Sequence, residues 1–390
     1  MSFPSIFEIS NEGLKILSIS WNTQAMNNPN ISEWIVGRIR SYTPDLVSIG
    51  YQEDVKPGSS FHSSTLPAVM MMMGYILIKR GRMMGIGSTS FKNGKCRGLR
   101  LSVYGIKNVA ISIVNYEYES IYRCNMIPIP KYDLYYQNFV QQISTVHNID
   151  RYEFESYYSS IWKNKGAIAI YLTFRYCQKV HTLLFINVHL PFNSSRLLSI
   201  YSPPIEQDIM FNEIYNYFIL FKNRYGEAVE HNINRPRPSH VILMGDLNYR
   251  VHPTDNITVL DMIDKLRDSK YRRQMYLEMD ELLHEMNRKV IPYMDEGVDG
   301  PYTFMPTCKR SKPRSSLKLK QIGETIYQSS YDGYKPGHLQ QRYPSWCDRI
   351  LHIGLTCILY DSFYIPDIMD QSDHDGVYSI HKLHEDIMPN

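Results

Sequence analysis

Short apolar segments spaced along the chain are the feature that most limits what it can fold into. Strands are expected at residues 14–21, 45–50, 75–79, 167–174, 181–188, 240–244, 349–353 and 377–380. Helical spacing of apolar residues predicts helices over 31–42, 66–73, 205–225 and 258–288. Strands outnumber helices, and several helices lie between pairs of strands. This pattern favours two β-sheets packed face to face, with helices on the outside.

The 390 residues allow one large domain or two small ones. Because no stretch rich in proline and glycine divides the chain, we predict a single domain over residues 1–390. Residues 115–160 are polar and rich in tyrosine, which we interpret as an insertion between strands. Residues 308–342 are basic at first and then rich in Ser, Lys, Gln, Gly and Pro, which predicts a mobile basic loop.

The charge distribution excludes one class of protein and leaves another open. A net charge of only +3 argues against a strongly basic nucleic-acid binder, so no nucleic-acid partner is expected. Residues 308–320 nevertheless hold six Lys or Arg and no acidic residue. This segment is either a solvated loop or a patch that faces an anionic lipid or substrate.

The six cysteines form no C-x-x-C pair, and their spacing predicts neither a zinc site nor a disulfide framework. Free thiols fit a reducing compartment, and we expect a cytoplasmic monomer. Residues 1–11 lack the basic and long apolar regions of a signal peptide, and no apolar run is long enough to span a bilayer. Any membrane contact is therefore expected to be peripheral and transient.

Short polar groups lie where several predicted strands begin or end, which is where a rigid sheet positions side chains and a loop exposes them. They are Trp21-Asn22, Gln52-Glu53, Asn187-Val188-His189, Gly245–Arg250, Pro344–Ile350 and Ser372–His374. The first three are weak signals taken alone, because a solvated polar residue or a hydrogen-bonded core histidine is the commoner outcome. The segment Gly245–Arg250, which reads Gly-Asp-Leu-Asn-Tyr-Arg after an apolar strand, is specific.

These side chains suit phosphate chemistry assisted by a metal ion. The amide oxygen of Asn22 and the carboxylate of Glu53 are hard ligands of the kind that Mg²⁺ prefers. Asp246 and Asn248 share one face of their segment, where a carboxylate can orient a water and an amide can hold the phosphate that it attacks. Asp348 enters one strand and His374 precedes another, so the carboxylate could fix the orientation of the imidazole.

Other hydrolytic mechanisms lack their motifs in this chain. There is no G-x-S-x-G segment for serine acyl transfer and no G-x-x-x-x-G-K-[ST] segment for nucleotide binding. Cys347 is followed by an arginine after two residues, at Arg349, and not by the C-x5-R loop of cysteine phosphatases. Water activated by a carboxylate is the mechanism that fits.

Taken in order, the polar segments resemble the motifs of the inositol polyphosphate 5-phosphatases, a branch of the Mg²⁺-dependent superfamily of DNase I-like enzymes. The matching segments are Trp21-Asn22, Gln52-Glu53, Asn164-Lys165-Gly166, Val188-His189-Leu190, Gly245–Arg250, Phe304–Lys309, Pro344–Leu351 and Ser372–His374. The resemblance extends over residues 14–380. Nucleases of the superfamily share the catalytic Asp, Asn and His of these motifs. They lack the other residues of the Gly245–Arg250 and Pro344–Leu351 motifs.

The resemblance implies an α+β fold, a four-layer α/β/β/α sandwich of two mixed sheets. It implies a phosphomonoesterase that removes the 5-phosphate from an inositol polyphosphate or a phosphoinositide by in-line attack of a water that Asp246 activates. The implied Mg²⁺ ligands are Asn22, Glu53 and Asp373. The implied catalytic residues are Asp246, Asn248, His374, Asp348 and His189. The implied substrate-binding residues are Asn164, Lys165, Tyr249, Arg250, Lys309 and Arg310.

The chain departs from the family pattern at positions that concern the substrate. Cys308 stands where the family has a tyrosine, Gln340 and Gln341 stand where it has a lysine, and Gly376 replaces a proline. No departure removes a catalytic residue. Two alternatives stay open: a superfamily nuclease acting on DNA phosphodiesters, and a phosphoinositide-binding protein that has lost catalysis.

Overall fold

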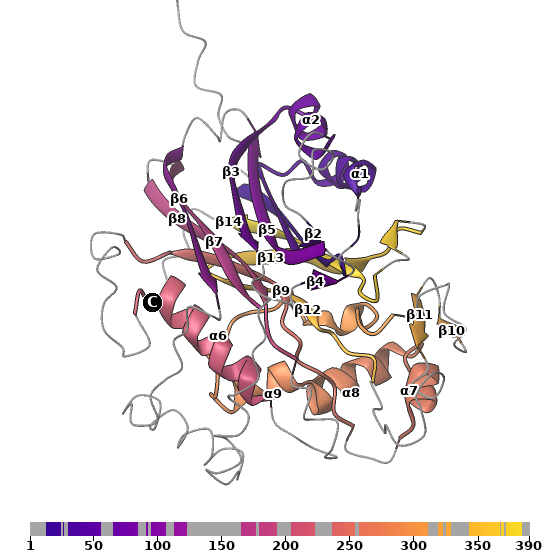
Figure 1. The fold of residues 1–390 in the computed structure, drawn as a ribbon. Helices are drawn as coiled ribbons and strands as arrows, with labels where there is room; N and C mark the ends of the chain where they lie inside the picture. The colour runs from indigo at the N-terminus through magenta and orange to yellow at the C-terminus, as the bar shows by residue number, and fades with distance from the viewer. Residues whose placement is uncertain are drawn as a thin grey trace, which may run out of the picture.

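The structure, a computed structural model, describes residues 13–24, 26, 30–55, 65–84, 91–92, 95–106, 113–122, 165–176, 179–192, 204–222, 236–253, 257–310, 319–322, 325–328, 343–366, 368–369 and 372–383. Two sheets form its centre, and helices cover their outer faces (Figure 1). The predicted α/β/β/α sandwich is therefore confirmed.

The larger sheet has seven strands in the order β13-β14-β1-β2-β5-β3, with β4 paired to β5. Their bounds are β1 (Leu14–Asn22), β2 (Leu46–Val55), β3 (Tyr75–Met84), β4 (Phe91–Lys92), β5 (Lys95–Ile106), β13 (Thr356–Phe363) and β14 (Gly376–Leu383). Strands β1 and β2 are parallel, with Asn22 opposite Gln52. The polar residues that end these two strands therefore lie side by side.

The smaller sheet has five strands in the order β12-β9-β8-β7-β6. Their bounds are β6 (Ile113–Tyr122), β7 (Gly166–Tyr176), β8 (Lys179–His189), β9 (His240–Asp246) and β12 (Asp348–Ile353). His189 on parallel β8 and Asp348 on antiparallel β12 both lie opposite Asp246. Strands β10 (Leu319–Ile322) and β11 (Thr325–Gln328) form a separate hairpin.

Helices pack on both outer faces. Their bounds are α1 (Ser32–Tyr42), α2 (Thr65–Met72), α6 (Ile205–Phe218), α7 (Val259–Lys265), α8 (Ser269–Met279) and α9 (Glu281–Asn287), with a 3₁₀ turn at Pro301–Thr303. Ile35 of α1 and Met70 of α2 belong to an apolar cluster with the outer face of β1 and β2. Phe211 of α6 and Met286 of α9 belong to the cluster on the outer face of β7, β8 and β9.

The segment predicted as one helix over 258–288 forms three helices, because three side chains cap new helix starts within it. Thr258 accepts a hydrogen bond from the backbone N–H of Asp261 at the start of α7. Asp268 and Asp280 do the same for α8 and α9. Such caps stabilise a helix start by about 1 kcal/mol each, and this one-residue signal outweighs continuous helical periodicity.

The space between the sheets changes from apolar to polar along the strands, and this change positions the functional site. On the inner face of β1, Leu14 and Ile16 join the central apolar core, whereas Ser18, Ser20 and Asn22 follow towards the strand end. Side chains alternate between the two faces of a strand, so these five share one face. The sandwich is therefore hydrophobic at one end and hydrogen-bonding at the other.

The sequence analysis did not predict strands β4, β5, β6, β10, β11 and β13. In β5 the inward residues Leu99, Leu101 and Val103 are apolar, but Arg97 and Arg100 interrupt the run. Strand β6, which begins at Ile113, overlaps the start of the predicted 115–160 insertion, and the rest of that insertion, residues 123–160, lies outside the described part of the chain. The predicted mobile loop at 308–342 is described only at residues 308–310 and in the β10–β11 hairpin. No helix among the described residues is long and apolar enough to cross a membrane.

Candidate active site

An amide network joins the two sheets beneath the polar end of the sandwich. Gln52 Nε2 donates hydrogen bonds to Ser20 Oγ at 3.0 Å and to Asn187 Oδ1 at 2.6 Å. Asn187 Nδ2 donates to two backbone carbonyls of the larger sheet, both at 3.0 Å. A Cβ at Gly50 would lie 2.9 Å from the Asn187 side chain, so glycine is needed for the two sheets to approach here. The network forms a rigid floor for the residues above it.

Asp246 lies at the centre of the residues that the sequence analysis selected. Its Oδ2 accepts a hydrogen bond from Asn22 Nδ2 at 2.9 Å and lies 3.3 Å from His189 Nε2 and 4.0 Å from His374 Nε2. Its Oδ1 accepts from the backbone N–H of Asn248 at 3.1 Å. Side chains that are distant in the sequence therefore meet at one carboxylate.

His374 and Asp348 form the predicted imidazole–carboxylate pair. His374 Nδ1 is 2.8 Å from Asp348 Oδ2, and the same oxygen accepts a hydrogen bond from Thr307 Oγ1 at 2.7 Å. The pair leaves Nε2 of His374 directed to the side where Asp246 lies, 4.0 Å away. This geometry allows the imidazole to donate to a ligand placed between it and Asp246.

The charges of this group are set by burial and by their neighbours. Burial raises the pKa of Asp246, but His374, His189 and Lys165 more than compensate and hold it well below its usual range. Burial lowers the pKa of His374, yet Asp348, Cys308 and Asp246 raise it well above its usual range. Asp246 is thus an anion and His374 a cation at neutral pH.

Burial raises the pKa of Asp348 to about 6, with His374 acting in the opposite direction. The carboxylate is ionised at neutral pH, and it takes up a proton in mildly acidic solution. The charge of the Asp348–His374 pair is therefore expected to change in mildly acidic solution.

Lys165 brings a second positive charge into the site. Its Nζ lies in contact with His189 Nε2, and the ammonium group is buried. Burial lowers the pKa of Lys165 to about 8, and the carboxylates of Asp246 and Glu53 act against that decrease. Glu53 itself binds Arg97, with Oε2 2.7 Å from Nη1. The site thus alternates anionic and cationic groups.

Arg250 connects the Gly245–Arg250 segment to the opposite side of the site. Its Nη2 donates to Asn248 Oδ1 at 2.9 Å, and its Nη1 lies 3.3 Å from Cys308 Sγ. Cys308 Sγ is in turn 3.6 Å from Nε2 of His374. Asn248 has a positive φ of 57°, which aims its side chain at this group and not along the strand. Cys308, one of the residues that depart from the family pattern, therefore lies inside the site.

A profile search places the chain in a family. Residues 19–380 match the endonuclease/exonuclease/phosphatase family 2. The chain belongs to this family. The matched residues include the smaller sheet, most of the larger sheet and all the residues gathered around Asp246.

Curated proteins similar to this chain are named as 5-phosphatases, as the sequence motifs predicted. Type I inositol polyphosphate 5-phosphatase 2 of Arabidopsis thaliana is 28% identical over 170 residues, which are 42% of this chain and 22% of the relative. Phosphatidylinositol 3,4,5-trisphosphate 5-phosphatase 1 of Mus musculus is 28% identical over 223 residues, 55% of this chain and 16% of the relative. The chain therefore matches less than a quarter of the length of either relative.

Two solved structures share the fold of this family 2 chain. One is the inositol polyphosphate 5-phosphatase domain of SpSynaptojanin with inositol (1,4)-bisphosphate and a calcium ion, with a TM-score of 0.58, 20% identity and coverage of 95% of this chain and 84% of that chain. The other is a Cimex nitrophorin ferrous NO complex, with a TM-score of 0.53, 14% identity and coverage of 95% and 98%. At such identities the likeness shows the DNase I-like fold alone.

Several predicted site residues face away from Asp246. Tyr249 lies in the apolar cluster under α6, where its hydroxyl donates to Asp208 Oδ1 at 2.9 Å. Arg310 is enclosed between the Tyr364 ring, at 3.2 Å from its centroid, and Asp375, at 3.3 Å. In place of the substrate contacts that we expected, these contacts give both side chains a packing role. Asn164 lies outside the described residues.

Lys309 and Asp373 are paired with each other. Lys309 Nζ is 2.5 Å from Asp373 Oδ2, and Asp373 Oδ1 is 3.9 Å from His374 Nε2. The pair therefore borders the His374 side of the site. Arg349, by contrast, binds Glu296 at 2.5 Å and Asp280 at 2.9 Å and has no exposed surface, which identifies it as a structural ion pair.

Two residues that position the site were not selected from the sequence. Thr307 holds Asp348, and Ser372 Oγ donates to the backbone carbonyl of Asn22 at 2.7 Å, which ties the His374 loop to β1. Both lie inside matched motifs, so motif membership was the available signal. Their roles depend on a hydroxyl reaching another strand, which spacing does not reveal.

The acidic and imidazole groups are close enough to hold a cation. Ligand atoms of Asp246, Asp348 and His374 all lie within 4.8 Å of one another. Asp373 Oδ1 borders the same cluster, 3.9 Å from His374 Nε2, and carboxylate oxygens are the hard donors that Mg²⁺ prefers. Asn22 turns its amide nitrogen to Asp246, and its Oδ1 accepts a hydrogen bond from the backbone N–H of Gln24 at 3.0 Å. The cluster is therefore a candidate site for a metal ion.

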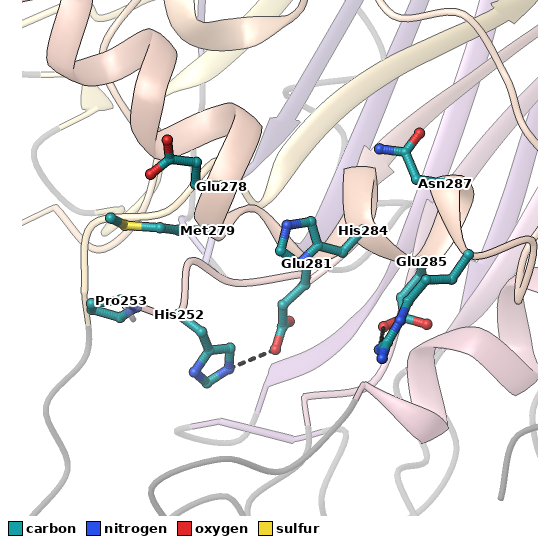
Figure 2. A pocket seen from close by; sticks show the side chains of 9 residues that line it. His252, Pro253, Glu278, Met279, Glu281, His284, Glu285 and Asn287 are labelled. Atoms are coloured by element: carbon teal, nitrogen blue, oxygen red, sulfur yellow. Dashed lines mark ion pairs between the residues drawn. The ribbon is translucent and has the colours of Figure 1, made fainter. Parts of the chain in front are cut away.

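A separate pocket lies on the other side of the Gly245–Arg250 segment, between the start of α9 and the residues after Arg250 (Figure 2). Its walls include His252, Glu281 and Glu285, and His252 Nε2 is 2.6 Å from Glu281 Oε1. None of the residues gathered around Asp246 lines it. The Glu281 carboxylate also accepts a hydrogen bond from the backbone N–H of Arg250 at 2.7 Å, so this wall supports the segment from behind.

Proposed function

We propose that the chain is a Mg²⁺-dependent phosphomonoesterase that removes the 5-phosphate of an inositol polyphosphate or a phosphoinositide. The observation that carries this proposal is the convergence of Asn22, His189 and the His374–Asp348 pair on Asp246. The motifs and the names of the curated relatives support the same reaction and the same class of substrate.

Asp246 is the residue that we assign to the attacking water. Its Oδ1 and Oδ2 are held by the Asn248 N–H and the Asn22 amide, so the carboxylate has a fixed direction. Because its pKa is depressed, Asp246 is a weak base in the resting site. Its contribution is therefore chiefly to orient the water for in-line attack, and it accepts the proton as the water becomes more acidic during bond formation.

His374, His189 and Asn248 are assigned to the phosphate oxygens. Charge on the transferring phosphoryl group is stabilised by donors that are already in place, so no reorganisation is needed during the reaction. His374 is suited to this task because Asp348 holds it charged and oriented through Nδ1. Lys165 and Arg250 add fixed positive charge beside the same position.

Asn22, Glu53 and Asp373 are the residues that would hold Mg²⁺, and the bound ion would stabilise negative charge on the phosphoryl oxygen and the leaving group. A Glu53→Gln variant tests this assignment. We expect it to need a higher Mg²⁺ concentration for half-maximal activity while its thermal unfolding stays near that of the wild type. An unchanged Mg²⁺ requirement would remove Glu53 from the metal site.

The groups beside the site bear on which further phosphates of the substrate are bound. Lys309, at the start of the basic segment 308–320, provides positive charge for a second phosphate of the inositol ring. We propose that the same segment gives transient contact with an anionic membrane, and that the protein acts as a cytoplasmic monomer. Both source classes, soluble inositol phosphates and phosphoinositides, offer this headgroup chemistry.

Phosphate release from a panel of soluble inositol phosphates and phosphoinositide vesicles tests the proposal, with and without Mg²⁺. We expect release only with the metal, and only from substrates that carry a 5-phosphate. Nicking of supercoiled plasmid under the same conditions would favour the nuclease alternative. Substrate binding without turnover would favour a non-catalytic binding protein.

A further inference from the structure

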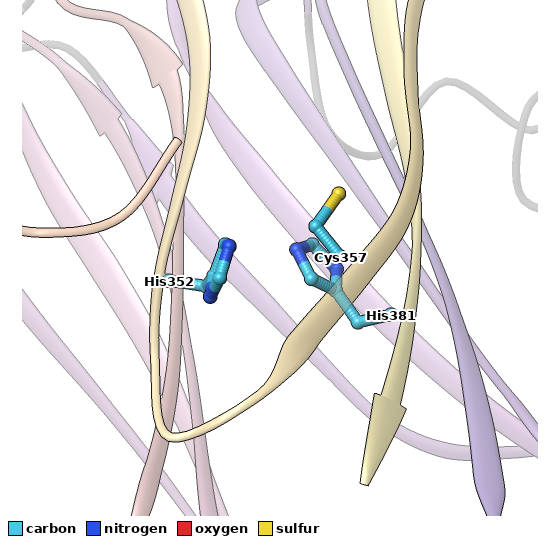
Figure 3. A group of neighbouring side chains, drawn as sticks. All are labelled: His352, Cys357 and His381. Carbon is cyan, nitrogen blue, oxygen red and sulfur yellow. The ribbon is translucent and has the colours of Figure 1, made fainter. Parts of the chain in front are cut away.

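A second group of ligand-type side chains lies between the sheets, separate from the residues around Asp246. It consists of His352 on β12, Cys357 on β13 and His381 on β14 (Figure 3). One potential ligand atom from each residue lies within 4.8 Å of the other two. All three side chains are buried, with exposed fractions of 4%, 8% and 0%. The group joins the smaller sheet, through β12, to the larger sheet, through β13 and β14.

The two imidazoles retain unused nitrogen atoms inside the protein. Neither nitrogen of His352 has a hydrogen-bond partner among the described residues, and the same is true of Nε2 of His381. His381 Nδ1 is 3.2 Å from Ser379 Oγ, which fixes the ring and leaves Nε2 as the available atom. A buried polar atom without a partner costs about 1–3 kcal/mol, so such atoms call for an explanation.

We propose that His352, Cys357 and His381 form a Zn²⁺ site that links the two sheets. Two imidazoles and one thiolate are the donors that Zn²⁺ selects, whereas Mg²⁺ prefers oxygen ligands. A metal bond at each unused nitrogen would satisfy the atoms that the protein leaves without partners. Three protein ligands leave the fourth position of a tetrahedral ion for a water molecule.

The distances require only a small closure of the group. Zn–N and Zn–S bonds of about 2.0–2.3 Å place tetrahedral ligand atoms roughly 3.3–3.8 Å apart. The ligand atoms lie within 4.8 Å, so shifts of about 1 Å or less in side-chain position would complete the geometry. The hydrogen bond from Cys357 Sγ to the Leu359 carbonyl, at 3.3 Å, would be given up as the thiol loses its proton to solvent.

Burial favours the neutral form of all three side chains, which suits the imidazole ligands and means that the thiol must lose a proton to bind a metal. Burial lowers the pKa values of His352 and His381, so both rings are neutral at physiological pH and keep a lone pair for a metal. Burial raises the pKa of the Cys357 thiol to about 12. Zn²⁺ binding would therefore release one proton per site, and the affinity would increase with pH.

The position of the site links it to the residues around Asp246. His352 and Asp348 are four residues apart on β12 and share its inner face, about 13 Å from each other at 3.3 Å per residue. His381 lies on β14, the strand that the His374 loop enters. A metal at this position would hold β12 and β14 together and so hold the two strands that carry the Asp348–His374 pair.

Zinc content and a cobalt spectrum of the full chain test this proposal without depending on enzymatic activity. The chain is treated with a chelator, exchanged into buffer with excess Mg²⁺, and incubated with one equivalent of Zn²⁺ or Co²⁺. We expect one equivalent of Zn²⁺ to remain after gel filtration and Co²⁺ to give a thiolate charge-transfer band. Failure of the wild-type protein to retain Zn²⁺, or a cobalt spectrum without that band, would overturn the proposal.

Two cysteine variants distinguish this site from the cation site near Asp246. Cys357→Ser should lose the charge-transfer band and retain less than a tenth of the Zn²⁺. Cys308→Ser, which changes the thiol beside His374, should keep both, and so should Asp246→Asn. The opposite pattern would place the metal at the catalytic group and would contradict the proposal.

A thermal measurement provides a second readout. Zn²⁺ should raise the Tm of the wild-type chain by several degrees and leave that of Cys357→Ser unchanged. Cys357→Ser is a conservative substitution for this test, because serine differs from cysteine only at the ligand atom. Equal Tm shifts in the wild type and in Cys357→Ser would overturn the proposal. This comparison does not depend on whether the histidine variants His352→Asn and His381→Asn fold.

Discussion

Two groups of buried ionisable side chains lie at the two ends of strand β12. They differ in whether a carboxylate lies beside the histidine. At the start of the strand, Asp348 pairs with His374, and His374 lies 4.0 Å from Asp246. At its end, His352 packs against His381, with ring centroids 4.7 Å apart, and neither ring has an acidic partner on its nitrogens among the described contacts. Burial is similar, so the difference comes from the neighbours.

The comparison shows what decides the state of a buried histidine. Burial by itself favours the neutral ring, as at His381, where the pKa is lowered well below its usual range. Carboxylates within hydrogen-bond reach reverse that effect at His374, where the pKa is raised. Strand β12 therefore carries Asp348, which keeps His374 a cationic donor suited to phosphate, and, four residues on, His352, a neutral ligand suited to a metal.

The largest expected difference between the two ends is catalytic. Replacing Asp246 by Asn keeps the shape of the side chain but removes the charge that orients the water, and we expect kcat to fall by about 10³-fold or more. Phosphate release under saturating substrate measures this effect, with circular dichroism as the control for folding. The Cys357→Ser variant, at the other end, should lose far less activity. Similar losses in the two variants would erase the distinction.

The next largest effect is expected at Asp348, where kcat should change much more than substrate binding. Asp348→Asn should lower kcat by about 10²- to 10⁴-fold, because an amide cannot hold the charged His374 ring in the same way. Binding of a non-hydrolysed substrate analogue should change much less than kcat. Weakened binding with unchanged kcat would show that Asp348 supports substrate affinity instead.

Acid should affect the two ends for different reasons. At the catalytic end, the pKa of Asp348 is about 6, so kcat/KM should decrease as the pH falls through that value and the carboxylate is neutralised. Asp246, with a depressed pKa, should contribute no titration near neutrality. A pH profile of kcat/KM that stays flat from pH 7 to pH 5 would contradict this assignment.

At the other end, acid should act on stability in the metal-free protein. The native pKa of His381 lies well below the ordinary value of 6.5, so the unfolded chain binds a proton that the native state does not. The free energy of unfolding should therefore decrease as the pH falls below 6.5, by about 1.4 kcal/mol per pH unit for each such histidine. Urea denaturation of the wild type and of His381→Asn measures this, and the variant should show the smaller slope. Equal slopes would show that His381 does not resist protonation.

The smallest expected effect concerns Cys308, where the chain departs from the family pattern. Hydrogen bonding with the Cys347 thiol, together with the charges of His374 and Arg250, lowers the pKa of the Cys308 thiol. Cys308→Ser keeps a small polar group between His374 and Arg250, and we expect KM to change by only a few-fold. The measurement is KM for each substrate of the panel. A loss of kcat comparable to that of Asp348→Asn would move Cys308 into the catalytic group.

The catalytic end was predictable from the sequence to a much greater extent than the other end. Asp246, Asp348 and His374 stand in segments whose residue order is specific, and the strand ends place them together. Tyr249 shows the limit, because its direction depends on the positive φ of the preceding Asn248. His352, Cys357 and His381 have no motif spacing. Only the packing of β12, in the smaller sheet, against β13 and β14, in the larger sheet, brings them together.

The fold was predicted where apolar runs were continuous and was missed where charge interrupted them. Strand β5 carries Arg97 and Arg100, which bind Glu53 and Asp54 across the sheet, and such compensation is invisible before the pairing is known. The single helix predicted over 258–288 was divided by Asp268 and Asp280. An aspartate is a common helix N-cap, so both residues could have been recognised as caps. The opposite charges at helical spacing indicated one continuous helix instead.

The most direct test of the account is the stereochemical course of hydrolysis of a substrate whose 5-phosphate is replaced by a thiophosphate that oxygen isotopes make chiral, because the released thiophosphate then keeps a stereogenic phosphorus. An in-line attack by a water that Asp246 orients predicts inversion at phosphorus, and the same reaction in Asp246→Asn should be slower by about 10³-fold or more. Retention of configuration would require a covalent enzyme intermediate and would contradict the central role given to Asp246.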